Sequence, residues 1–182
     1  MTLCGMSAFR EETDGASRLS PSLLVVPKQA VRRPAGELRR IGCGIDGGEA
    51  STFALRVAAE AAAALEAELE VIRALATASP VIERVVSEEL AAGALAQLRQ
   101  AMASLPEGLL AQGVIVQDRD PARGIASRSR ALDVLVVGTR SGSPAGSALL
   151  GEFSARLAEH AECPLLVVPL GVETPLAELF NV

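Results

Sequence analysis

The stretch from Asp133 to Pro169 constrains the fold more strongly than any other part of the chain. It opens with an apolar run, Asp133–Gly138, which ends in glycine and is typical of a buried strand. A loop of Gly, Ser and Pro follows at Thr139–Ser147, then a segment of helical spacing at Leu149–Ala161, and a second apolar run at Leu165–Val168. This order predicts a right-handed crossover between parallel strands. The glycine-rich loop would lie at the carboxyl end of the first strand, where an α/β sheet holds a ligand.

The rest of the chain continues the same alternation of strands and helices. The expected strands are Arg40–Ile45, Leu69–Leu75, Gly113–Gln117, Asp133–Gly138 and Leu165–Val168, and the expected helices are Glu49–Ala67, Val81–Leu105, 121–131 and Leu149–Ala161. This alternation of strands and helices predicts an α/β fold with a doubly wound, five-stranded parallel sheet in the order 3-2-1-4-5. Strands one and four then flank the switch point, so Asp46 and Gly138 would face each other across a crevice.

The composition narrows the classes of function. The 182 residues, 49% of them hydrophobic, suffice for one good core. Aromatic residues make up only 2%, with no Trp or Tyr, which excludes the base-stacking platforms of RNA-binding proteins. The net charge of −5 also argues against binding to a polyanion. We therefore expect no nucleic-acid partner.

The sequence carries no signal for a membrane or for export. No apolar run approaches the ~20 residues that a membrane span needs, and charged residues at 10–12 stand where a signal peptide would be apolar. The three cysteines are scattered, and together with the single histidine they lack metal-ligand spacing. We expect a cytoplasmic protein with no metal site and no membrane partner.

The residues needed for catalysis are missing. The only histidine, His160, lies at the end of a helix, and Cys43 lies inside an expected buried strand. Lys28 is the only lysine and precedes the first strand of the expected domain, so no Walker lysine exists. The glycines of Gly42–Gly47 spell GxGxxG, but a dinucleotide fingerprint needs them after a strand, whereas here they form the strand. We expect no catalytic residues.

Three sequence motifs resemble those of the universal stress protein family: VVGTR at 136–140, a glycine thirteen residues after Gly138, and EHAECPLLVVP at 159–169. Nucleotide-binding members carry Gly, two residues, Gly, nine residues and Gly-Ser or Gly-Thr, then a helix that ends HAxCPVLVV. Gly138 and Gly151 fill the first and third glycine positions here. Ser141 stands at the second, and Glu152 stands where a hydroxyl residue is usual. The resemblance implies a Rossmann-like fold of the adenine-nucleotide-binding type.

The resemblance also implies a set of candidate nucleotide-binding positions. In the family, an aspartate at the position of Asp46 touches the adenosine; the alternative is that Asp46 caps the following helix. Ser141 impairs the close approach of the loop to a phosphate. Glu152 places a carboxylate beside a phosphate, which opposes binding by roughly 1–4 kcal/mol. The family-matched positions are Gly44, Ile45, Asp46, Val137, Gly138, Arg140, Ser141, Gly151, Glu152, Phe153 and Ser154.

The amino-terminal segment contains a copy of the last expected strand. Leu23–Pro27 reads LLVVP, as Leu165–Pro169 does, and a basic, linker-like stretch follows it. In tandem members of the family, a linker of this kind follows a domain's final strand. We interpret residues 17–39 as the remnant of a preceding domain; the alternative is an extension without structure. The expected division is 1–39 for the extension and linker, 40–170 for the universal stress protein-like domain, and 171–182 for the tail.

The repeated pentapeptide predicts an added amino-terminal strand. Final strands of the family often pair antiparallel across a two-fold axis, so Leu165–Val168 would be a self-association edge. A bare apolar edge is an association hazard unless it is covered. We predict that Leu23–Val26 pairs antiparallel with Leu165–Val168 within one chain, and that deleting residues 1–28 converts the protein to dimers or aggregates.

Three functions compete. The first is a universal stress protein-like, stress-response regulatory domain, non-catalytic and without a tightly bound cofactor, which acts through itself or other proteins. The second is a stress protein that binds ATP or another adenine nucleotide through a rebuilt loop. The third is an enzyme of the wider nucleotide-binding α/β class. We favour the first, because the second needs a phosphate site that Ser141 and Glu152 weaken, and the third needs residues that are absent.

Overall fold

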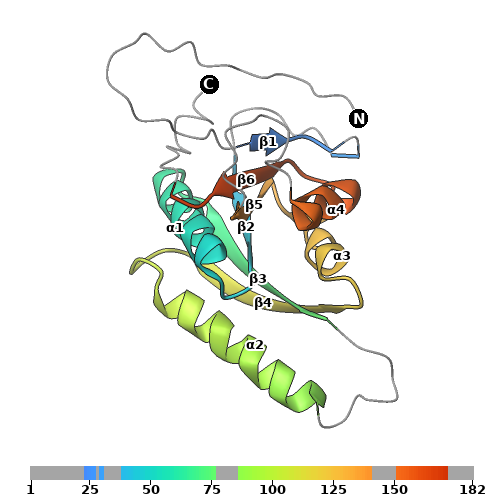
Figure 1. Ribbon diagram of the computed structural model, residues 1–182. Helices are drawn as coiled ribbons and strands as arrows, with labels where there is room; N and C mark the ends of the chain where they lie inside the picture. The colour runs from blue at the N-terminus through green and yellow to red at the C-terminus, as the bar shows by residue number, and fades with distance from the viewer. Residues whose placement is uncertain (1–22, 28, 31–37, 77–85, 141–150, 172–182) are drawn as a thin grey trace.

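The computed structural model describes residues 23–27, 29–30, 38–76, 86–140 and 151–171 (Figure 1). In this part of the chain, six strands form one sheet in the order β1-β6-β5-β2-β3-β4. β2 to β6 are parallel, in the predicted order 3-2-1-4-5, and β1 adds antiparallel to β6. The strands are β1 (Leu23–Val25), β2 (Arg40–Ile45), β3 (Glu68–Ala76), β4 (Ala111–Asp118), β5 (Val134–Thr139) and β6 (Leu165–Pro169), and the helices are α1 (Glu49–Ala64), α2 (Val86–Ala103), α3 (Pro121–Ala126) and α4 (Glu152–His160), with a 3-10 turn at Ser129–Ala131.

The helices cover both faces of the sheet. α1 and α2 lie on one face, and α3 and α4 lie on the other (Figure 1). Ile41 and Cys43 of β2 belong to the core under α1, whereas Gly42 faces the opposite core, where a Cβ would lie 2.3 Å from a methyl carbon of Leu132. Gly42 and Gly44 of the GxGxxG pattern are thus strand residues, as predicted, but the prediction is wrong for Gly47, which follows β2 in a turn with a φ of 81°.

The predicted continuous helix over 121–131 is wrong. α3 begins as expected, with Asp120 accepting a hydrogen bond from the amide of Ala122 and with proline at the start of the helix. It ends at Ala126, and a separate 3-10 turn follows. The hydroxyl groups of Ser127 and Ser129 donate to backbone carbonyls three residues earlier, and such local bonds compete with the helical ladder.

β1 closes the edge of the sheet within one chain, as predicted from the repeated pentapeptide. Its three residues pair antiparallel with the first three residues of β6. Val25 packs partly against the core between α4 and the sheet, and Pro27 is buried. The side-chain amide of Gln29 donates to the backbone oxygen of Glu159 at 2.8 Å, which anchors the segment after β1 to the end of α4. Among the described helices, none has both the length and the apolar character required for a bilayer span.

Candidate functional site

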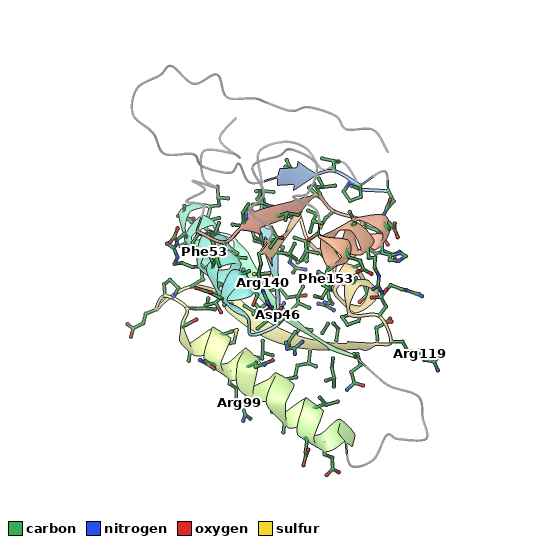
Figure 2. All side chains as sticks on the ribbon, viewed as in Figure 1. Asp46, Phe53, Arg99, Arg119, Arg140 and Phe153 are labelled. Carbon is green, nitrogen blue, oxygen red and sulfur yellow. The ribbon has the colours of Figure 1, made fainter. Side chains whose placement is uncertain are left out.

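The fold brings the predicted switch-point residues together at the carboxyl edge of the sheet. β2 and β5 are adjacent and parallel, with Gly44 opposite Val137, so both strands end at the same edge. Asp46 follows β2, and Arg140 follows β5. Figure 2 shows the two side chains meeting there, with a guanidinium nitrogen 4.0 Å from a carboxylate oxygen. This register confirms that Asp46 and Gly138 lie at the same edge of the sheet, as the predicted strand order requires; the crevice between them stays a prediction.

Gly138 allows β5 and α1 to approach each other closely through a backbone contact. A Cβ at this position would lie 2.1 Å from the carbonyl oxygen of Ala50, in the first turn of α1. Only glycine lets β5 approach α1 this closely. The glycine is therefore required by packing, whether or not a ligand is bound.

Asp46 organises the turn that leads into α1. Its carboxylate accepts a hydrogen bond from the amide of Gly48 at 2.7 Å, and its own amide donates to the hydroxyl of Ser51 at 3.3 Å. Gly48 is the N-cap residue and offers no side-chain cap. Asp46 thus fixes the turn two residues before the N-cap, which is close to the capping role expected as the alternative to nucleotide contact.

The charge of Asp46 is stabilised by its surroundings. Desolvation of the carboxyl raises its pKa, but the hydrogen bonds from Ser51 and Gly48 lower it. The positive charges of Arg140 and Arg73 lower it further, so the net pKa of Asp46 lies below its ordinary value. The carboxylate is ionised at neutral pH, and it places a negative charge at the carboxyl edge of the sheet, beside Arg140.

The start of α4 forms the other predicted wall of the crevice. Gly151 is the N-cap residue and supplies no side-chain cap, and Glu152 is the first helical residue, with an exposed side chain. Phe153 is 40% exposed, whereas Ser154 is buried at 3%. Ser154 therefore lies among the inward-facing residues of α4, and its hydroxyl is withdrawn from solvent. Ser141 lies outside the described residues.

The remaining predicted site residues are part of the strands. Gly44 and Ile45 end β2, and Val137 lies in β5; Ile45 and Val137 are buried in the two cores. Through their side chains these two residues contribute packing. Their backbone positions the polar residues that follow each strand.

Two residues at this edge were missed by sequence reasoning. Arg73 lies opposite Ile45 in the neighbouring strand β3, and it donates to the side-chain oxygen of Gln97 at 2.8 Å. Gln97 reaches from α2 over Gly47, where a Cβ would lie 2.8 Å from the Gln97 amide nitrogen. The only signal in the sequence was an arginine inside a largely apolar run that also holds Glu70. Nothing in it pointed to Gln97.

The rest of the described chain offers no group of metal ligands and one unreactive buried thiol. None of the described His, Cys, Asp and Glu residues form a group of three or more that could hold a metal ion. Burial raises the pKa of the Cys43 thiol to about 12, so this thiol stays protonated and unreactive. An open cavity of about 570 Å³ lies at the amino ends of β2 and β3, opposite the crevice, and is lined by Leu38, Arg39, Arg40, Leu65, Glu66, Glu68 and Leu110.

The sheet order and the crevice define the class of protein. This is a doubly wound, Rossmann-like α/β protein whose candidate ligand site lies at the switch point of the sheet. A model of the universal stress protein family matches residues 37–169. The chain belongs to the universal stress protein family, as its motifs indicated.

Solved structures of this family share the fold. A universal stress protein family member from Burkholderia pseudomallei is 24% identical with a TM-score of 0.59, over 75% of this chain and 99% of that one. UspA from Lactobacillus plantarum is 23% identical with a TM-score of 0.55, over 73% and 99%. An Arabidopsis thaliana member, solved with AMP bound, is 20% identical with a TM-score of 0.55, over 79% and 99%. No curated protein matches the sequence.

Proposed function

We propose that this chain is a non-catalytic regulatory domain of the universal stress protein family, without tight ATP binding, that acts by association with itself or with other proteins. The observation that carries the proposal is the position of Glu152. Its exposed carboxylate lies in the first turn of α4, directly after an N-cap glycine. A phosphate held by this helix would have to lie beside that carboxylate.

The cost to a bound phosphate follows from electrostatics. The N-terminus of a helix carries about half a positive charge, and a carboxylate in its first turn already supplies the counter-charge. Two like charges a few Å apart at a partly buried site repel by roughly 1–4 kcal/mol. This is about one to three decades of affinity. The ionised Asp46 lies near the positive charges of Arg140 and Arg73, so the opposition to a phosphate rests on Glu152.

The absence of a reactive pair among the described residues supports a non-catalytic role. His160 is exposed at the last residue of α4, where its ring suits the negative end of the helix. Cys43 is buried with a raised pKa.

An adenine-nucleotide-binding protein is the second candidate. The register of β2 and β5 keeps Asp46 at the crevice, where family members contact adenosine. The Arabidopsis thaliana structure of similar fold was solved with AMP bound. In this candidate, residues of the loop after Arg140 supply the phosphate contacts that the family pattern assigns to the positions of Ser141 and Glu152.

A paired substitution tests the proposal. Isothermal titration of the unmodified protein with ATP should show no binding tighter than about 100 μM, given the charge opposition. Ser141→Gly combined with Glu152→Ser should tighten binding by at least about tenfold. Glu159→Gln, which removes an exposed carboxylate from the other end of the same helix, is the matched control and should change nothing. Equal affinities for the paired variant and the unmodified protein would refute the role of Glu152.

A further inference from the structure

The sheet has one covered edge and one open edge in the part of the chain that the structure describes. β1 covers β6, whereas β4 is the last strand at the other end, where Figure 1 shows it together with α2. The amide of Leu69 donates to the carbonyl of Leu110, so the even-numbered positions of β4 bond to β3. The backbone groups that point outward from the open edge are those of Ala111, Gly113, Ile115 and Gln117.

The open edge lacks the devices that usually protect an edge strand. β4 reads AQGVIVQD, with no proline or lysine and with a single charge at its end. Val114, Ile115 and Val116 are β-branched and stay half-buried, whereas the apolar residues of β3 are mostly buried. A flat apolar edge of eight residues is a template for pairing with another strand.

The sequence of β4 complements itself when the strand is turned around Ile115. An antiparallel second copy centred there places Val114 opposite Val116 and Gln112 opposite Asp118, so like lies against like. Ile115 lies opposite itself and exchanges both backbone hydrogen bonds, because its amide and carbonyl point outward. Moving the centre by one residue sets Gln112 opposite Val116 or Asp118 opposite Val114, which favours the register centred on Ile115.

One side of α2 forms the second part of this surface. Four exposed residues share that side at a helical spacing of four, three and four, and we call them the α2 stripe: Glu88, Ala92, Leu95 and Arg99. The stripe is on the side opposite Gln97, whose side chain reaches inward over Gly47, so it faces outward beyond β4. Figure 2 shows Arg99 pointing away from the sheet. None of the ion pairs between described residues uses Glu88 or Arg99.

The strand and the helix place a two-fold axis at the same point. Leu98 of α2 lies over Gly113, with its Cγ 3.0 Å from where a Cβ would be. Ile115 is about 7 Å further along β4, and α2 runs the opposite way at about 1.5 Å per residue, so the axis passes between Gly93 and Ala94. Antiparallel stripes about this point place Glu88 opposite Arg99 and Ala92 opposite Leu95 of the second copy.

We propose that β4 and the α2 stripe form a two-fold interface with a second copy of this chain. The inference rests on the self-association part of the proposed function, for which it names the surface. The two β4 strands join two sheets into one, and the two stripes pack side by side with opposite charges at each end. The occupant is specified as another copy, because the apolar register of β4 and the charge register of α2 are both self-complementary about one axis.

A change at the backbone of the edge tests the pairing of β4. Gln117→Pro removes an amide that points away from β3, at an exposed side chain, so the fold of one chain should persist. Gln117→Ala keeps the amide and is the matched control. By light scattering at about 100 μM, the unmodified protein and Gln117→Ala should have twice the 18.8 kDa mass of one chain. Gln117→Pro should have the mass of one chain and remain folded by circular dichroism. A folded Gln117→Pro protein of doubled mass overturns the pairing.

A charge exchange tests the stripe. Arg99→Glu and Glu88→Arg should each raise the dissociation constant of the dimer by about tenfold, because every dimer contains two such contacts. The double variant restores opposite charges and should recover the affinity of the unmodified protein to within about twofold. Glu89→Arg makes the same charge change one residue away, off the stripe, and should leave the affinity unchanged. A double variant weaker than either single one overturns the contact between Glu88 and Arg99.

The outcomes separate this inference from the proposed function. An unmodified protein with the mass of one chain at this concentration overturns the inference and leaves association with other proteins to be tested. A dimer that persists in both Gln117→Pro and Arg99→Glu forms through another surface, which overturns the inference and leaves the proposed function intact. If Gln117→Pro unfolds, the charge exchange at the exposed stripe decides. Tight ATP binding would refute the proposed function without changing any of these masses.

Discussion

The crevice at the carboxyl edge and the edge of β6 are held in shape by different means. At the carboxyl edge, a backbone contact between Gly138 and Ala50 fixes the approach of β5 to α1. Asp46 follows β2 at this edge and Glu152 begins α4, so both predicted nucleotide-binding positions carry carboxylates. The β6 edge is closed by a three-residue ladder and one side-chain anchor. Backbone packing therefore holds the carboxyl edge, whereas a short ladder and one side-chain contact hold β1.

The largest expected effect on stability comes from disrupting the contact between Gly138 and Ala50. Gly138→Ala places a methyl group 2.1 Å from the carbonyl oxygen of Ala50, and backbone cannot yield as a flexible side chain can. We expect the free energy of unfolding to fall by about 3 kcal/mol or more. The measurement is urea unfolding followed by circular dichroism.

Gly93→Ala is the matched control for this experiment. Gly93 lies on the exposed face of α2, and a Cβ there meets nothing within 4 Å. Alanine should stabilise the helix by about 0.5–1 kcal/mol. The two substitutions are thus expected to have opposite signs. A Gly138→Ala protein as stable as the unmodified one would show that the contact with Ala50 does not require glycine at position 138.

The second largest effect on stability is expected at Gln29, which anchors the segment after β1 to the end of α4. Gln29→Ala removes the side-chain hydrogen bonds to the carbonyls of Ala158 and Glu159. It should lower the free energy of unfolding by about 1 kcal/mol, the usual net value for one hydrogen bond. Gln100→Ala, on the exposed face of α2, should change it by less than about 0.5 kcal/mol. Equal values for the two variants would mean that Gln29 does not anchor β1.

A smaller effect is expected at the start of α4. Glu152→Gln removes the carboxylate that complements the helix dipole, at an exposed position, and should cost about 0.5 kcal/mol at low salt. Glu152→Asp keeps the charge and serves as the control. Thermal unfolding is measured for the Glu152→Gln and Glu152→Asp variants at low and at high salt. The difference in stability between the two variants should shrink as the salt concentration increases. A salt-independent difference would point to packing instead of charge.

The smallest effect is the titration of Asp46. Its pKa is lowered, so the stability that it contributes is present above the ordinary value of about 4 and is lost as the pH falls through the lower folded value. Carboxyl carbon chemical shifts should therefore give a midpoint below about 4 for Asp46. Arg140→Gln should move this midpoint upward, because it removes a nearby positive charge. An unchanged midpoint in the Arg140→Gln variant would show that Arg140 does not lower the pKa of Asp46.

Much of this arrangement could be predicted from the sequence, because local patterns determine it. Apolar runs with glycine and proline boundaries located the strands, and their alternation with helices gave the order of the sheet. The repeated LLVVP predicted the pairing of β1 with β6, since a strand's own copy is a suitable antiparallel partner for an apolar edge. The placement of Asp46 beside the end of β5 followed from topology alone.

Two of the features that escaped prediction depend on side chains that lie far apart in the sequence, and a third depends on local serine hydrogen bonds. Glu70 is buried in β3 and pairs with Arg128, 58 residues away, and no sequence pattern connects the two. The contact of Arg73 with Gln97 joins a strand to a helix in the same way. The break between α3 and the 3-10 turn was missed because serine hydroxyls bond to carbonyls that a helical pattern assigns to the backbone.

The most direct test of the central claim is the nucleotide content and affinity of the unmodified protein. The protein is purified, its bound nucleotide is released by acid and quantified by chromatography, and the protein is then titrated with ATP by calorimetry. The account predicts nucleotide well below one per chain and no dissociation constant tighter than about 100 μM. ATP that copurifies at one per chain, or a dissociation constant of a few micromolar, would contradict the claim that Glu152 closes the crevice to phosphate.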